Sequence, residues 1–133
     1  MVTDPSLELQ KALISAIKAI PTLAGNNVFD TVPGSNPFPR ITVGIGSHVP
    51  DMAGCRDATE STMQIDAWSR DVGFPEVKTI ADQLRTRLND GELTLTGHVL
   101  ELMLVELTDM SRDQDGITNR ARINLRIITS PAT

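Results

Sequence analysis

Aromatic residues are the scarcest class in this 133-residue chain, which holds three Phe, one Trp and no Tyr. A buried core must therefore be built from Leu, Ile, Val, Met and Ala. Proteins that hold single-stranded nucleic acid stack its bases on exposed rings, so the scarcity of rings argues against that class. Basic residues are also in the minority, because 12 Lys and Arg stand against 17 Asp and Glu and the formal net charge is −5. Such a chain is not expected to be attracted to phosphate backbones.

Cysteine is nearly absent as well, since Cys55 is the only one. This excludes an intrachain disulfide and fits a reducing interior. No apolar run approaches the roughly 20 residues of a membrane span, and the first residues lack the features of a signal peptide. A structural zinc site needs four N or S ligands, whereas His48, His98 and Cys55 offer only three. We expect one soluble domain over residues 1–133, made inside the cell, with no metal, no cofactor and no membrane partner.

Two stretches have helical periodicity. Asp4 and Pro5 form a helix start, and apolar residues at three- and four-residue spacing predict a helix that Pro21 ends. A second apolar stripe predicts a helix from Val77 to Leu88, followed by the stop signal at residues 89–91.

Alternating apolar and polar residues predict strands at 28–31, 40–47, 59–69, 93–95, 98–110 and 119–129, with an exposed loop at 48–58. The Asp115-Gly116 pair predicts a hairpin turn before the last strand. Hairpin-joined strands imply an antiparallel sheet, and two amphipathic helices must cover a face of it. The predicted fold is an α+β single-domain sandwich, a mostly antiparallel sheet packed against two helices.

The G-x-G at Gly44 and Gly46 raises the question of a nucleotide site. The third glycine of a dinucleotide fingerprint would fall at Val49, and a predicted loop replaces the required helix. We interpret the stretch as a strand, with Ile41, Val43 and Ile45 toward the core. Thr42, Gly44 and Gly46 then leave the opposite face nearly bare, which permits close approach by a helix, a bulge or a neighbouring subunit.

The last predicted strand places Arg120, Arg122 and Arg126 on one face, opposite its apolar residues. These guanidinium groups can line a path for a polyanion, or pair with carboxylates across the sheet or between subunits. The acidic total favours pairing, and the candidate carboxylates are Asp66, Glu101 and Glu106. Trp68, on the polar side of its strand, is interpreted equally well as the rim of the core or as an interface anchor.

Several stretches together resemble a family of small phage and prophage proteins. They are "DPSLELQKALISAI", "VFDTVPGSNPFPRITVGIG", "MQIDAWSR" followed by "EVKTIADQLRTRL", "LTLTGH" and "DMSRDQDGITNRARINLRI". In this order they are similar to the tail terminator (tail completion) proteins of long-tailed phages and gene transfer agents. The resemblance covers roughly residues 4 to 130.

The resemblance implies a virion structural protein of the tail-neck region, assembled in the bacterial cytoplasm and without enzymatic activity. Such proteins form a homo-hexameric ring that caps the tail tube, ends its polymerisation and offers a surface to the head-side connector. The implied partners are other copies of the chain, the major tail tube protein and the head-completion or stopper protein. DNA passes through the ring lumen without sequence-specific binding. The family has no catalytic residues to transfer.

Interface candidates follow from pattern alone: Trp68, the three arginines of the last strand, and Asp51 and Met52 in the predicted loop 48–58. That loop and residues 109–118 are expected to reach the tube or the connector. Three alternatives remain open. One is another neck component, an adaptor or a stopper; the second is a small enzyme that uses Cys55 and His48; the third is a DNA-binding module.

Overall fold

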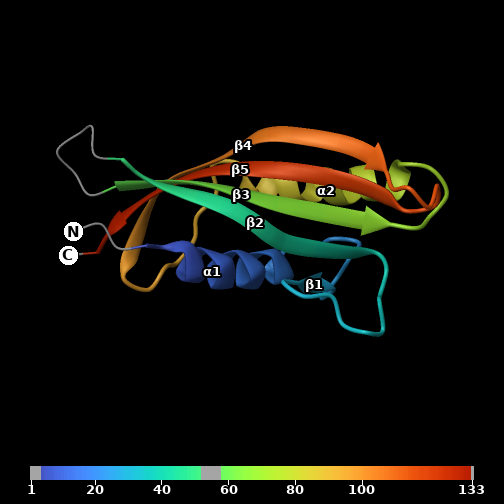
Figure 1. The fold of residues 1–133 in the computed structure, drawn as a ribbon, viewed down its shortest axis with the longest axis horizontal. Coiled ribbons are helices and arrows are strands. Elements are labelled where there is room, and N and C mark those ends of the chain that lie inside the picture. Colours follow the sequence, from blue (N-terminus) through green and yellow to red (C-terminus); the bar gives the residue numbers. More distant parts are fainter. Residues whose placement is uncertain (1–3, 52–57, 133) are drawn as a thin grey trace.

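A five-stranded sheet with two helices packed on it forms the structure, a computed structural model that describes residues 4–51 and 58–132 (Figure 1). For Ile45 and Asp51 it describes the backbone only. The elements are α1 (Ser6–Ala19), β1 (Val28–Phe29), β2 (Arg40–Asp51), β3 (Ala58–Ser69), α2 (Pro75–Leu88), β4 (His98–Arg112) and β5 (Asn119–Pro131). The predicted α+β fold class is confirmed.

The strand order is β1-β2-β3-β5-β4. The short strand β1 pairs with β2 in parallel, and every other pairing is antiparallel. After β3 the chain passes through helix α2 to β4, which is not a neighbour of β3 in the sheet (Figure 1). The hairpin at residues 113–118 then leads to β5, which lies between β3 and β4. The last strand of the chain therefore lies inside the sheet, where it pairs along nearly its whole length on both sides.

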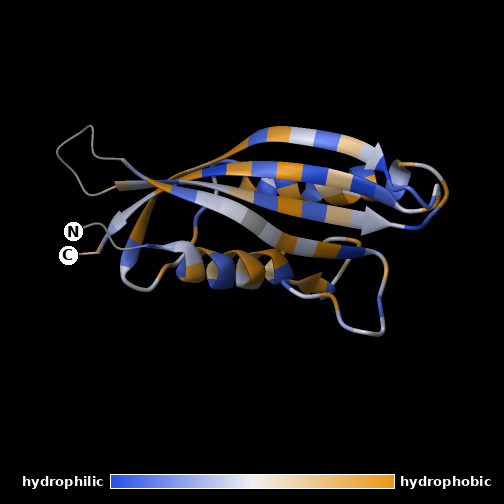
Figure 2. Ribbon diagram, viewed as in Figure 1, coloured by the Kyte–Doolittle hydropathy of each residue, from blue (hydrophilic) through white to orange (hydrophobic). Residues whose placement is uncertain are grey.

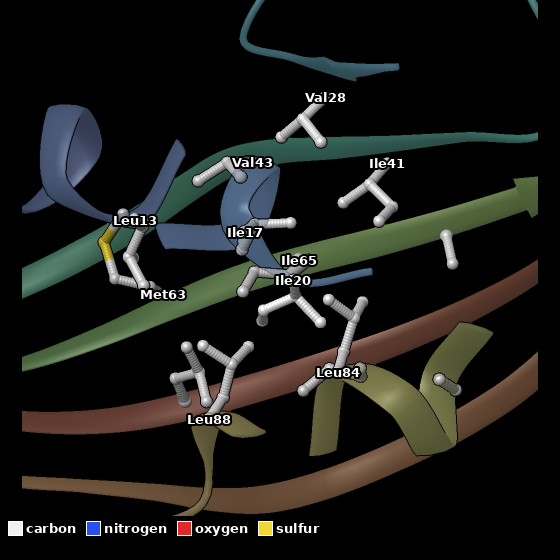
Figure 3. Close-up of a cluster of buried hydrophobic side chains, with 14 of the residues drawn as sticks. Leu13, Ile17, Ile20, Val28, Ile41, Val43, Met63, Ile65, Leu84 and Leu88 are labelled. Atoms are coloured by element: carbon white, nitrogen blue, oxygen red, sulfur yellow. The ribbon is translucent and has the colours of Figure 1, made fainter. Parts of the chain in front are cut away.

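The core lies between the helices and one face of the sheet. Alternate residues of β2, β3 and β5 are fully buried on this face, as Val43, Ile65 and Leu125 illustrate. Leu13 and Ile17 of α1 and Leu84 and Leu88 of α2 belong to the same cluster, so both helices cover the same face (Figure 3). The strands alternate accordingly between hydrophobic and hydrophilic residues along their length (Figure 2). No aromatic ring belongs to this cluster among the described residues, although Phe74 packs against its edge.

Helix α1 begins at the start signal predicted from Asp4 and Pro5, and α2 begins at Pro75, two residues before the predicted Val77. The Asp4 carboxylate accepts a hydrogen bond from the Ser6 amide at 2.9 Å, and Pro75 occupies the first turn of α2. After α2, Asn89 and Asp90 attach the chain to the outer edge of β4. The Asp90 amide donates to the Met103 carbonyl at 2.7 Å, and the Val105 amide donates to Asn89 Oδ1 at 3.0 Å. The middle of an otherwise open edge strand is thereby capped.

Several predicted boundaries are wrong. The strand expected at 28–31 is limited to Val28–Phe29, and β4 continues to Arg112 into the expected loop 109–118. Two further differences change the state of a whole stretch. Residues 48–51, expected in an exposed loop, extend β2 and pair with residues 58–61 of β3. Each of these residues is paired with a residue at the beginning of β3. Residues 93–95, expected as a strand, have no strand partner. Their alternation has another cause, since Leu93 and Leu95 are partly buried against the core from the segment that connects α2 to β4.

Because of a bulge in β2, Gly46 does not lie on the face of the sheet where strand alternation predicts it. The register runs from Val43↔Ile65 to Gly46↔Met63, so β2 contains one extra residue here. The extra residue reverses the alternation, and Gly46 lies with Met63 on the helix-covered face instead of the opposite one. A Cβ at Gly46 would lie 2.6 Å from Met63 Sδ and 2.8 Å from the Thr62 carbonyl oxygen, whereas a Cβ at Gly44 would meet nothing within 4 Å. Of these two glycines, only Gly46 has such a close neighbour.

Candidate interface on the uncovered face of the sheet

The face of the sheet opposite the helices carries most of the predicted site residues. Trp68 of β3 is directly opposite Arg120 of β5, and Asp66 is opposite Arg122. Arg126 is opposite Thr62 farther along the same two strands. Because paired residues project from the same face, the sheet brings the tryptophan and the three arginines onto one surface.

Asp66 is the centre of this surface. Its side chain is only 9% exposed, and it accepts hydrogen bonds from Arg120 Nε at 3.1 Å and Arg120 Nη2 at 3.0 Å. Arg122 Nε lies 3.4 Å from the same carboxylate, and Gln64 Nε2 donates to it at 2.9 Å. The two-bond contact with Arg120 fixes the plane of the guanidinium as well as its position. Cross-strand pairing with Asp66, one of the alternatives for these arginines, is what the structure shows.

Arg126 forms a separate and more exposed group. Its Nε lies 2.7 Å from Glu60 Oε1 and 3.7 Å from Glu106 Oε1. The hydrogen bond to Glu60 and the charge of that carboxylate raise the pKa of Arg126 above its ordinary value. All three side chains are more than a third exposed, so water screens the attraction and the group contributes little to stability. Glu106 was a candidate from sequence, whereas Glu60 was missed.

Trp68 is half-buried on the uncovered face and is not part of the core. Its indole Nε1 donates to Thr42 Oγ1 at 3.0 Å, which fixes the ring on the neighbouring strand. The Arg120 guanidinium carbon lies 4.8 Å from the ring centroid and that of Arg40 lies 5.7 Å from it. Cation–π contacts on a polar surface of this kind hold the ring in one orientation.

Phe38 adds a second ring to this end of the sheet, and sequence reasoning missed it. The guanidinium carbons of Arg40 and Arg70 each lie 4.2 Å from its centroid. Arg40 also donates to Asn36 Oδ1, while its buried Nε has no partner among the described residues. Burial lowers the pKa of Arg40, and the charge of Arg70 lowers it further. Strand alternation places Trp68 on the polar side of its strand, but its pairing with Arg40 and the approach of Arg70 to Phe38 are seen only in the structure.

The remaining predicted residues lie elsewhere. The backbone of Asp51 ends β2, far along the strand from Arg40; Met52 and Cys55 lie outside the described residues. His48 Nδ1 lies 2.7 Å from Ser61 Oγ, and a hollow of about 220 Å³ there is lined by Asp4, His48 and three neighbours. Hydrogen bonding from Ser6 lowers the pKa of Asp4, as do the charges of His48 and His98. Thr59, which lines the hollow, and Ser61 are both buried, so the described residues place no exposed hydroxyl nucleophile beside His48.

Metal binding and membrane insertion each require a recognisable feature of the structure. Within residues 4–51 and 58–132, no three His, Cys, Asp or Glu side chains are grouped so as to hold a metal ion. No helix in the described part of the chain has the length and apolar character needed to cross a membrane.

Comparison with known proteins finds a matching family and similar solved structures. The family described as "Tail completion protein gp17" matches residues 11–130. Among solved structures, a chain of the "Virion of native gene transfer agent (GTA) particle" is 19% identical, with a TM-score of 0.85. The alignment covers 95% of this chain and 97% of that chain. At this identity the likeness shows a shared fold over the whole domain. A search among curated proteins finds no match.

Proposed function

Because this chain belongs to the tail completion protein gp17 family of phage tail structural proteins, we propose that it caps the finished tail tube as a hexameric ring. In this position it ends polymerisation of the tube and offers the head-side connector a docking surface. Its partners are then other copies of the chain, the tail tube protein and the stopper protein, and DNA passes through the lumen. The match over residues 11–130 is the observation that carries the proposal.

The fold supports a place in a virion. The gene transfer agent chain of the same fold is matched over nearly its whole length, so no large domain of that chain is missing from this one. A chain reduced to one sheet and two helices offers no cofactor-binding subdomain among its described residues. A structural role without enzymatic activity agrees with this.

A ring of identical subunits uses heterologous contacts, in which one surface meets a different surface of the neighbour. The uncovered face provides a rigid candidate, because Trp68, Arg120 and Arg122 are held by Thr42 and Asp66. Aromatic and arginine side chains are enriched at such contacts. We assign Trp68, Arg120, Arg122 and Arg126 to subunit or partner contacts. We also assign Asp51, the last residue of β2, and Met52 to such contacts.

The proposal is tested by the mass of the purified protein in solution together with negative-stain imaging, alone and mixed with tail tubes that lack their cap. We expect six-fold rings at one end of each tube and tubes of constant length. A protein that leaves the tube ends bare, even at high concentration, contradicts the proposal. Rings that bind only portal-side proteins would instead identify an adaptor or a stopper.

A further inference from the structure

Three guanidinium groups at one end of the sheet have no charged partner. Within the described ranges 4–51 and 58–132, no carboxylate lies within ion-pair distance of Arg40, Arg70 or Arg112. Arg40 and Arg70 both lie against Phe38, and Arg112 lies 4.7 Å from the centroid of Phe74. The rings hold these cations in place without neutralising them.

Arg70 and Arg112 border a hollow of about 350 Å³ between the segment from β3 to α2 and the β4–β5 hairpin. Two large apolar side chains stand beside the charges: Val72 is 93% exposed and Ile117 is 61% exposed. Figure 1 places both segments together at one end of the elongated molecule, where β3 ends and β5 begins. Two cations beside two exposed aliphatic side chains form a surface suited to a carboxylate next to an apolar pocket.

The carboxylates closest in sequence are already engaged. Asp115 accepts hydrogen bonds from the side chain and amide of Thr118 and from the Ile117 amide, and these bonds lower its pKa to about 2. Asp71 lines the hollow, but its carboxylate accepts from the Val72 amide. Asp113, next to Arg112, accepts from the Gln114 amide at 3.0 Å. The charge of Arg70 lowers the pKa of Asp115 further, but no carboxylate of these turns lies within ion-pair distance of Arg70 or Arg112 among the described residues. The two arginines are therefore able to pair with an external anion.

A complementary surface lies at the opposite end of β4. A hollow of about 360 Å³ is lined there by residues 92–95 and 98–100, among them the aliphatic side chains of Leu95, Val99 and Leu100. Glu92 stands at its rim, exposed and without an ion pair to any described residue. Val99 is 51% exposed. The strand between the two surfaces has 15 residues and so spans about 50 Å.

The geometry points to a self-contact in which Val72 of one copy enters the 92–100 hollow of the next, and Glu92 of that copy pairs with Arg70 and Arg112. This contact rests on the proposed ring and names one of its interfaces. Since the two surfaces are different and lie at opposite ends of one strand, the contact is heterologous, as ring closure requires. A second copy of the chain is the partner that this surface fits, because Glu92, the acid that matches the arginines, is present on every copy.

The test uses surface variants that leave the fold intact. Val72→Asp and Glu92→Arg each change an exposed side chain and should weaken self-association at least about tenfold, the loss typical of one charge-assisted contact. Association is measured by sedimentation velocity and by counting rings on tail tubes. Leu23→Asp and Asp30→Arg are the matched controls, since both positions are exposed and far from the two surfaces in the sequence. The controls should associate as the unaltered chain does.

A charge exchange sharpens the result. Arg70→Glu and Glu92→Arg should each form rings poorly alone, with the same loss of self-association. An equal mixture should recover them, because copies that alternate in a ring bring opposite charges together at every contact. Normal rings from Val72→Asp and Glu92→Arg would overturn this contact and leave the ring itself standing. Equal loss in the two controls would also overturn it. Absence of rings from the unaltered chain on tail tubes would instead contradict the proposed function, and this contact with it.

Discussion

The two faces of the sheet are made by the same strands yet differ in almost every property. On the covered face, Ile65 and its neighbours Met63 and Ala67 are buried and belong to the hydrophobic core cluster. On the other face, Asp66 and Trp68 of the same strand hold arginines through ion pairs and ring contacts. Burial of apolar area stabilises the fold without direction, whereas the polar contacts are directional and leave groups near solvent. The first face supplies stability and the second supplies a defined surface.

The largest expected effect comes from the covered face. Ile65→Ala removes a completely buried side chain from a strand near the centre of the sheet. The free energy of unfolding should fall by about 2–5 kcal/mol, from the lost transfer energy and the cavity left behind. Urea denaturation followed by circular dichroism measures it. Thr62→Ala, an exposed position of the same strand, is the control and should change stability by less than about 0.5 kcal/mol. Equal effects at the two positions would contradict the distinction between the faces.

The second largest loss of stability is expected at the bulge in β2, after which the alternation of residues between the two faces is reversed. Gly46→Ala places a methyl group against Met63 Sδ and the Thr62 carbonyl, and the backbone oxygen cannot move aside cheaply. We expect a loss of about 1–3 kcal/mol in the free energy of unfolding, as for other overpacked sites. Gly44→Ala, with open space around its Cβ, is the matched control. Thermal unfolding of the two variants measures the difference. A Gly44→Ala variant that is less stable than Gly46→Ala would contradict the close contact at Gly46.

The smallest effect belongs to the uncovered face. Asp66→Ala removes the carboxylate that holds Arg120 and Arg122, whose side chains are 26% and 37% exposed and so turn to water when freed. The loss should be about 1–2 kcal/mol, between that of a charged hydrogen bond and that of an exposed ion pair. Tryptophan fluorescence should change as well, because Arg120 no longer lies fixed over Trp68. A loss as large as that of Ile65→Ala would mean that both faces stabilise the fold equally.

Local patterns predicted most of the elements. The apolar stripes of both helices and the alternation in residues 59–69 and 119–129 match buried positions, since burial on one face imposes these periods. The arginines of β5 were placed on one face for the same reason. Residues 48–51 and 93–95 were misjudged because polar strand residues resemble a loop, and alternating leucines that pack from a connecting segment resemble a strand.

By itself, the sequence determined which residues are apolar on which side of each element, and hence two amphipathic helices, a half-covered sheet and an arginine face. Only the tertiary structure decided which strands became neighbours, because the insertion of β5 between β3 and β4 depends on contacts between residues far apart in the chain. It also placed Arg70 against Phe38, and it placed Arg70 and Arg112 at one hollow between the β3–α2 segment and the β4–β5 hairpin. These residues come from segments with no common period, so their proximity is a property of the assembled sheet and of no local pattern.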